Sequence, residues 1–140
     1  MDAKEFLNQV YNLDQRVKSK LRRLEEVRSL AERVTVSYGA ERVSLSRNTG
    51  QLEDAVIRIA EAEHDADEAI DCYVDARKKV TDIIDMVRNP KYRELLELRY
   101  LQFMTWERIA EEMWYTKRWV YRMHGIALKI VDKLLQEEYT

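Results

Sequence analysis

The fold is decided by residues 105–128, TWERIAEEMWYTKRWVYRMHGIAL, which contain two short helical patterns separated by a turn. Thr105 and Thr116 each precede one pattern, where a threonine hydroxyl can cap a helix N-terminus. Small Ala110 lets two helices cross closely, and apolar side chains at Ile109, Met113, Tyr115, Val120 and Met123 would lock the crossing angle. These features predict a helix-turn-helix, with the second helix continuing to about Glu137.

The second helix of this unit carries a basic face. Arginine and lysine can donate to guanine in the major groove, and tyrosine can reach a phosphate or a thymine methyl group. Between Tyr115 and Lys133 there are five basic residues and one acidic residue. We therefore predict double-stranded DNA as a partner, although charge alone would fit a solvated helix face. The predicted DNA-binding residues are Thr105, Thr116, Lys117, Arg118, Tyr121 and Arg122.

The two tryptophans beside this face have separate expected roles. Trp119 lies between the apolar and basic sides, and packing on the first helix is favoured over base contact. Trp106 is expected to cover the preceding helix.

The residues before this unit predict another helix and a boundary. Asn89-Pro90 interrupts a long helical pattern, because proline lacks an N–H and disfavours helix at the residue before it. With Asn89 as cap, a helix is expected from Pro90 to about Leu101, with apolar Tyr92, Leu95, Leu96, Leu98 and Tyr100. We place the domain boundary here: 1–88 as an antiparallel coiled-coil hairpin and 89–140 as a helix-turn-helix DNA-binding domain.

Residues 2–38 and 51–88 have heptad-like apolar repeats. The first repeat is Phe6, Val10, Leu13, Val17, Leu21, Leu24, Val27, Ala31 and Val34. The second places Leu52, Ile59, Ala66, Tyr73, Val80 and Val87 seven apart, with Val56, Ile70 and Ile84 between them. Residues 39–50 are rich in Gly, Ser, Asn and Thr and are expected to form a loop, with Val43 and Leu45 tucked onto the helices. Two paired helices therefore make up the first domain.

Charge indicates how these two helices pair. Residues 16–33 carry seven basic and three acidic residues, whereas residues 61–75 carry seven acidic residues and no basic one. Folding back about the 39–50 loop brings these blocks together, which favours the antiparallel orientation. Two such hairpins could form a four-helix bundle, so a homodimer through the hairpin is a further expectation.

From Pro90 onward the chain resembles region 4 of bacterial sigma factors. The similarity lies in RELLELRYL (93–101), TWERIAEEM (105–113), TKRWVYRM (116–123) and ALKI (127–130), and covers about 45 of the 140 residues. Region 4 reads the −35 promoter element, so the resemblance implies DNA binding in transcription. The whole architecture is similar to phage late-transcription regulators of the ArpU and RinA kind, which implies a phage or prophage gene.

This sequence departs from the region 4 pattern at two positions. Trp114 stands at the turn where the family usually has glycine, so it must accept a positive φ or adopt another turn. Gly125 stands within the second helix, where the absence of a side chain would allow the close approach of a neighbour or of a DNA backbone.

Other classes of protein find less support. The single Cys72 gives no internal disulfide, the N-terminus lacks a signal core, and no stretch is apolar enough for a membrane span. We therefore expect a cytoplasmic protein of a bacterial host cell. The motif Glu61-x-x-His64 lacks the second copy that a di-iron site needs, so neither metal nor cofactor is predicted. No catalytic motif is present, and an enzyme is not predicted. The alternatives are docking on RNA polymerase with little DNA contact, or a coiled-coil interaction protein.

Overall fold

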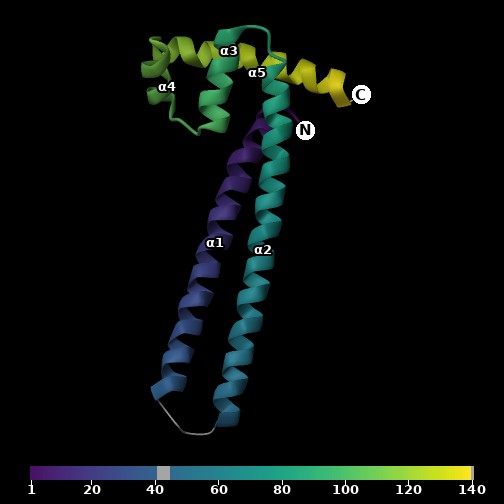
Figure 1. Cartoon of the computed structure of the whole chain (residues 1–140). Helices are drawn as coiled ribbons and strands as arrows, with labels where there is room; N and C mark the ends of the chain where they lie inside the picture. Colours follow the sequence, from purple (N-terminus) through teal and green to yellow (C-terminus); the bar gives the residue numbers. More distant parts are fainter. Residues whose placement is uncertain (41–44, 140) are drawn as a thin grey trace. The chain divides into compact units, whose positions relative to one another are not determined.

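The chain is all-helical in the computed structural model, which describes the backbone of residues 1–40 and 45–139. Side chains are described for residues 1–34 and 50–139. The elements are α1 (Ala3–Ala40), α2 (Leu45–Asp85), α3 (Pro90–Leu96), the π-helical turn η1 (Glu97–Leu101), α4 (Trp106–Met113) and α5 (Lys117–Tyr139). Figure 1 shows α1 and α2 as a long antiparallel pair, followed by the shorter helices. The prediction of an all-α fold with this order of elements is therefore confirmed.

The expected loop at 39–50 is wrong over most of its length. The helix α1 continues through Gly39 to Ala40, and α2 already begins at Leu45. The polar residues between Leu45 and Gly50 thus extend a helix, because adding a residue to an existing helix costs far less free energy than forming its first turn. Residues 41–44 lie outside the described residues, as do the side chains of Val43 and Leu45, whose tucking was predicted.

Two compact units divide the chain. One contains Met1–Leu13 and Tyr73–Thr140, and the other contains Asp14–Cys72. The first unit thus joins one end of each long helix to the four C-terminal elements. The boundary expected at residue 88 stays a prediction, and the two units are described separately below.

In the unit Asp14–Cys72, α1 and α2 meet through small side chains. Leu24 packs with Ala62 and Ala66, and Val27 and Ile59 cover this cluster. In the described part of α2 within this unit, the buried side chains are Ala62, Ala66 and Ala69, and Ala76 of the other unit is also buried. Val56, expected in the seam, is instead 62% exposed, and Leu21 of α1 is also exposed. Alanine lets two helices approach closely.

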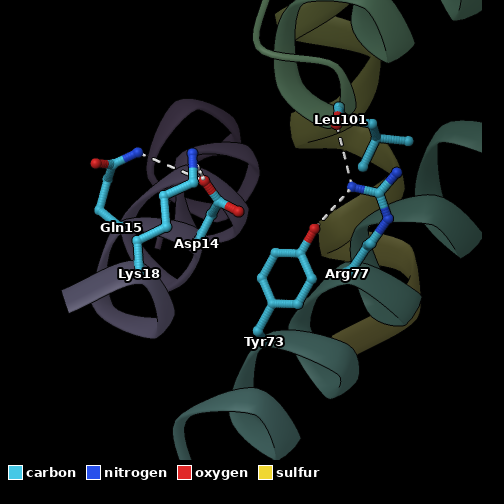
Figure 2. A network of polar contacts seen from close by, with 6 residues as sticks. All are labelled: Asp14, Gln15, Lys18, Tyr73, Arg77 and Leu101. Carbon is cyan, nitrogen blue, oxygen red and sulfur yellow. Dashed lines mark hydrogen bonds and ion pairs between the residues drawn. The ribbon is translucent and has the colours of Figure 1, made fainter. Parts of the chain in front are cut away.

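Charged contacts on this unit agree with the antiparallel pairing. Arg28 of α1 lies 3.0 Å from Glu63 of α2, so the basic and acidic blocks do meet. Within α1, Lys18 pairs with Asp14 at 3.1 Å, and the Gln15 amide donates to the same carboxylate (Figure 2). The Arg28–Glu63 pair is exposed, whereas Asp14 is half-buried. Exposed pairs contribute only about 0.2–1 kcal/mol each.

The unit formed by Met1–Leu13 and Tyr73–Thr140 has two apolar clusters. In the larger one, Leu7 and Val10 of α1 pack with Ile84 of α2, Leu96 of α3 and Val131 of α5. The smaller one joins α3 to α4 and α5 and consists of Leu95, Ile109, Ala110, Met113, Val120 and Met123. The buried face of α5 therefore contributes to both clusters, which hold this helix in place.

Polar contacts secure the segment that leads into α4. The Asn89 side chain accepts from the backbone N–H of Lys91 at 2.9 Å, so its predicted capping role is confirmed. Figure 2 shows the Arg77 guanidinium of α2 donating to the Tyr73 hydroxyl at 3.2 Å and to the Leu101 carbonyl at 3.1 Å. Arg77 thereby satisfies a carbonyl at the C-terminal end of η1, where intrahelical donors are lacking.

Candidate nucleic-acid interface

The helix α4 begins and ends with side-chain and backbone caps. The Thr105 hydroxyl accepts from the backbone N–H of Arg108 at 3.2 Å, as predicted. At the other end, the N–H of Trp114 donates to the Glu111 carbonyl and the N–H of Tyr115 donates to the Ala110 carbonyl at 3.1 Å. This pair of hydrogen bonds is a Schellman motif, which requires a left-handed residue directly after the helix.

Trp114 is that left-handed residue, with φ 60° and ψ 38°. Of the two options that the sequence left open, it accepts the positive φ. The strain is of order 1–3 kcal/mol for a residue with a Cβ, and the two backbone hydrogen bonds of the motif offset part of it. The Trp114 side chain is 92% exposed, so apolar packing does not compensate the strain.

The helix α5 starts directly after this turn. The Thr116 hydroxyl accepts from the backbone N–H of Trp119 at 3.1 Å, which confirms Thr116 as the cap. The inner side of α5 is buried at Val120, Met123, Ala127 and Val131. Val120 and Met123, which were predicted to lock the crossing of the two helices, are thus buried, and Leu135 is buried near the C-terminus. The caps and the buried side together fix which side chains of α5 face outward.

All six predicted DNA-binding residues are exposed, but their side chains are engaged differently. Lys117 Nζ lies 2.5 Å from Glu107 Oε1 of α4, so its charge is already paired. The Glu107 pKa is lowered, first by the hydrogen bond from Lys117, and the Lys117 pKa is raised by the same bond. Tyr121 places its ring edge on Trp106, with ring centroids 5.3 Å apart. Both residues therefore help to join α4 to α5.

Arg118 and Arg122 differ from these neighbours. Both are exposed, and among the described residues neither forms an ion pair or a side-chain hydrogen bond. They are separated by one turn of α5, so they lie on the same side of the helix. By contrast, Arg77, Arg93 and Arg99 of the same unit donate to backbone carbonyls. Arg118 and Arg122 thus keep their full donor capacity for an external acceptor.

The two tryptophans near this face, Trp106 and Trp119, can be compared with their predicted roles. Trp106 contacts the preceding element, because the Arg99 guanidinium of η1 lies 4.4 Å from its ring centroid. Its predicted role is confirmed, and it also touches α5 through Tyr121 and His124. Trp119 is 47% exposed, and its expected packing on α4 stays a prediction.

A polar contact that the sequence did not suggest lies behind the candidate face. Tyr100 Oη is 2.5 Å from His124 Nε2, and the Trp106 ring lies 4.6 Å from the His124 ring. Burial lowers the His124 pKa to about 4, with smaller contributions from the charges of Arg99 and Lys4. Burial likewise raises the Tyr100 pKa to about 12. At neutral pH the contact therefore joins an uncharged phenol to an uncharged imidazole. The residues are 24 apart, and no local pattern signals the contact.

Gly125 lies in the middle of α5 with helical backbone and an exposed surface. A Cβ built at this position meets no heavy atom within 4 Å, apart from the local helix backbone. Glycine is about 1 kcal/mol less favourable than alanine within a helix. The described chain therefore does not explain why glycine occupies this position.

Comparison of the chain with known protein families, curated proteins and solved structures gives no match. None of the helices in residues 1–40 and 45–139 combines the length and apolar character needed to cross a membrane. The same residues contain no group of three or more His, Cys, Asp or Glu side chains that could hold a metal ion.

Proposed function

We propose that the protein is a sequence-specific DNA-binding regulator of transcription, with α4 and α5 as a helix-turn-helix. The observation that carries this proposal is the pair of exposed, unpaired arginines, Arg118 and Arg122, on the first turns of α5. Arginine is the side chain best suited to guanine, because its planar fork can donate to O6 and N7 together. The resemblance to sigma region 4 supports the same function, and the similarity of the whole architecture to phage late-transcription regulators favours a phage or prophage gene.

The division among the exposed residues sharpens this proposal. Arg118 and Arg122 read bases, whereas Lys117 and Tyr121 hold α5 against α4 through Glu107 and Trp106. Thr105 and Thr116 cap their helices with their hydroxyls, and the free N–H groups at those helix ends can still face phosphates. The specificity determinants are therefore fewer than the basic face suggests.

Selection of bound duplexes from a random pool tests this function and yields a target sequence. On the selected duplex, Arg118→Ala should weaken binding by about 1–3 kcal/mol, while binding to random DNA falls much less. Arg108→Ala is a matched control, because Arg108 is also exposed but pairs with Glu112 at 3.5 Å. If no sequence is enriched, or Arg118→Ala keeps its affinity and footprint, the proposal is wrong.

Docking on RNA polymerase is a second candidate function, and Trp114 favours it. A tryptophan that is 92% exposed on a strained turn gains little from the fold, whereas tryptophan is enriched among residues that dominate protein interfaces. Trp114→Ala should then weaken polymerase binding and leave binding to the selected duplex unchanged. Loss of DNA affinity in this variant would assign Trp114 to the DNA interface instead.

A homodimer through the α1–α2 pair would fit the same function, since two copies could read two half-sites. Its support is a set of exposed apolar side chains on the unit Asp14–Cys72: Leu21, Leu30, Val56 and Ile57. Light scattering should give the mass of a dimer, and Ile57→Glu should lower that mass. A monomeric wild-type protein would remove the dimer from the proposal.

A further inference from the structure

Basic residues continue along the exposed side of α5 well beyond Arg122, and Gly125 stands among them. From Arg118 the next members of this side follow at spacings of four, three, four and four, which keeps them on one face of a helix. We call this set the α5 strip: Arg118, Arg122, Gly125, Lys129 and Lys133, all of them exposed. Within the described residues its four cations form no ion pair.

Gly125 interrupts the strip without serving the fold. Its φ is not positive, and no side chain or neighbouring helix occupies the space that a Cβ would fill. The remaining structural use of glycine is the close approach of another molecule to the helix backbone. Because the surrounding strip is cationic, that molecule should be a polyanion.

We propose that the sugar–phosphate backbone of duplex DNA crosses α5 at Gly125, and that Lys129 and Lys133 hold phosphates beyond the crossing. The inference rests on the proposed function of the α4–α5 unit. At about 1.5 Å per residue, Gly125 lies about 10 Å along the axis from Arg118, and Lys133 about 22 Å. The major groove is only about 12 Å wide. A helix whose first turns read bases therefore meets the groove wall near Gly125.

This geometry separates two kinds of contact on one helix. Arg118 and Arg122 lie within the groove width and can reach base edges. Lys129 and Lys133 lie outside it and can reach only phosphates, which carry affinity but no sequence information. The missing side chain at Gly125 lets the backbone approach while both ends of the strip are engaged.

Alanine at Gly125 tests the crossing point, and Gly50 supplies a matched control. Gly50 lies in α2, where a built Cβ also meets nothing within 4 Å. Gly125→Ala and Gly50→Ala should both raise Tm, because alanine favours a helix. Only Gly125→Ala should weaken binding, by about tenfold, to both the selected duplex and a random-sequence duplex. Gly125→Gln should weaken binding further, whereas Gly50→Gln should not. Wild-type affinity in Gly125→Ala and Gly125→Gln would overturn the proposal.

The salt dependence of binding tests the lysines. Lys129→Gln and Lys133→Gln should each reduce the slope of log affinity against log salt by about one, equally on both duplexes. If both variants keep the wild-type slope, the phosphate contacts are wrong. Different results would contradict the proposed function itself. These are a wild-type protein that binds neither duplex, or an Arg118→Ala variant that keeps the wild-type preference for the selected duplex. Failure of the inference alone leaves the Arg118 effect intact while the Gly125 and lysine variants behave as wild type.

Discussion

The phenol oxygen of Tyr100 lies 2.5 Å from Nε2 of His124, and the two rings stack with centroids 5.7 Å apart. This contact joins η1 to α5, and Trp106 of α4 packs against the same imidazole. The elements η1, α4 and α5 thus meet around one imidazole, which is uncharged at neutral pH.

Stability should consequently fall in mild acid. The His124 pKa is lowered from 6.5 to about 4 in the folded protein, so the unfolded chain takes up the proton first as pH falls. Between about 6.5 and about 4 the free energy of unfolding should drop by about 1–2 kcal/mol from this group, reduced for its partial exposure. Urea unfolding across this range measures the drop. His124→Gln should remove this component, whereas replacing exposed His64 with Gln should retain it. Equal pH profiles for all three proteins would contradict the prediction.

Trp114→Gly should stabilise the protein by about 1 kcal/mol, because glycine adopts φ 60° without strain and the exposed indole makes little contact to lose. Phe103 has a similar φ of 58° but places its ring edge on Tyr11, with centroids 5.4 Å apart. Phe103→Gly should therefore destabilise by about 2 kcal/mol. The Tm values of the two variants measure these effects. Because the two positions have nearly the same φ, the difference in Tm reflects the packing that Phe103 makes and Trp114 lacks. A lower Tm for Trp114→Gly would mean that the indole stabilises the turn.

Ala66→Leu should destabilise the unit Asp14–Cys72 by about 1–3 kcal/mol, because Ala66 is buried where α1 and α2 approach through small side chains. Val56→Leu, on the exposed side of the same helix, should change stability by less than about 0.5 kcal/mol. Chemical denaturation of both variants gives the comparison. A stabilised Ala66→Leu protein would show that the seam has unfilled space.

The parts of this structure that depend on local chemistry could be predicted from the sequence. The caps Asn89, Thr105 and Thr116 all form, because each hydroxyl or amide accepts from an N–H two or three residues away. The helix order and the antiparallel pairing follow from apolar spacing and charge in the same way. Trp114 was recognised as anomalous, although its sequence alone did not choose between the two backbone solutions.

The wrong predictions concern features that depend on contacts with, or continuation of, neighbouring helices. Val56 was assigned to the seam from its spacing with Ile70 and Ile84, yet the buried side chains in the described part of α2 up to Cys72 are Ala62, Ala66 and Ala69. The 39–50 segment contains residues of low helix propensity, but the adjoining helices extend into it. At the candidate site, the Lys117–Glu107 pair depends on how α4 crosses α5. The spacing of residues along α5 predicts that Lys117 lies on the basic face, but it does not predict how α4 crosses α5.

That pair gives the last prediction, which rests on the proposed function. Glu107 holds Lys117 Nζ at 2.5 Å on the face offered to DNA, so Glu107→Gln should release a lysine for phosphate contact. The variant should bind a random-sequence duplex more tightly at low salt, with a salt slope steeper by about one. Glu111→Gln removes the same charge from the exposed side of α4 but leaves the Lys117 pair intact. Only the excess of Glu107→Gln over Glu111→Gln therefore reports the freed lysine. Identical slopes for the two variants would mean that Lys117 remains directed away from DNA, and Arg118 and Arg122 would then provide the cationic contacts at the start of α5.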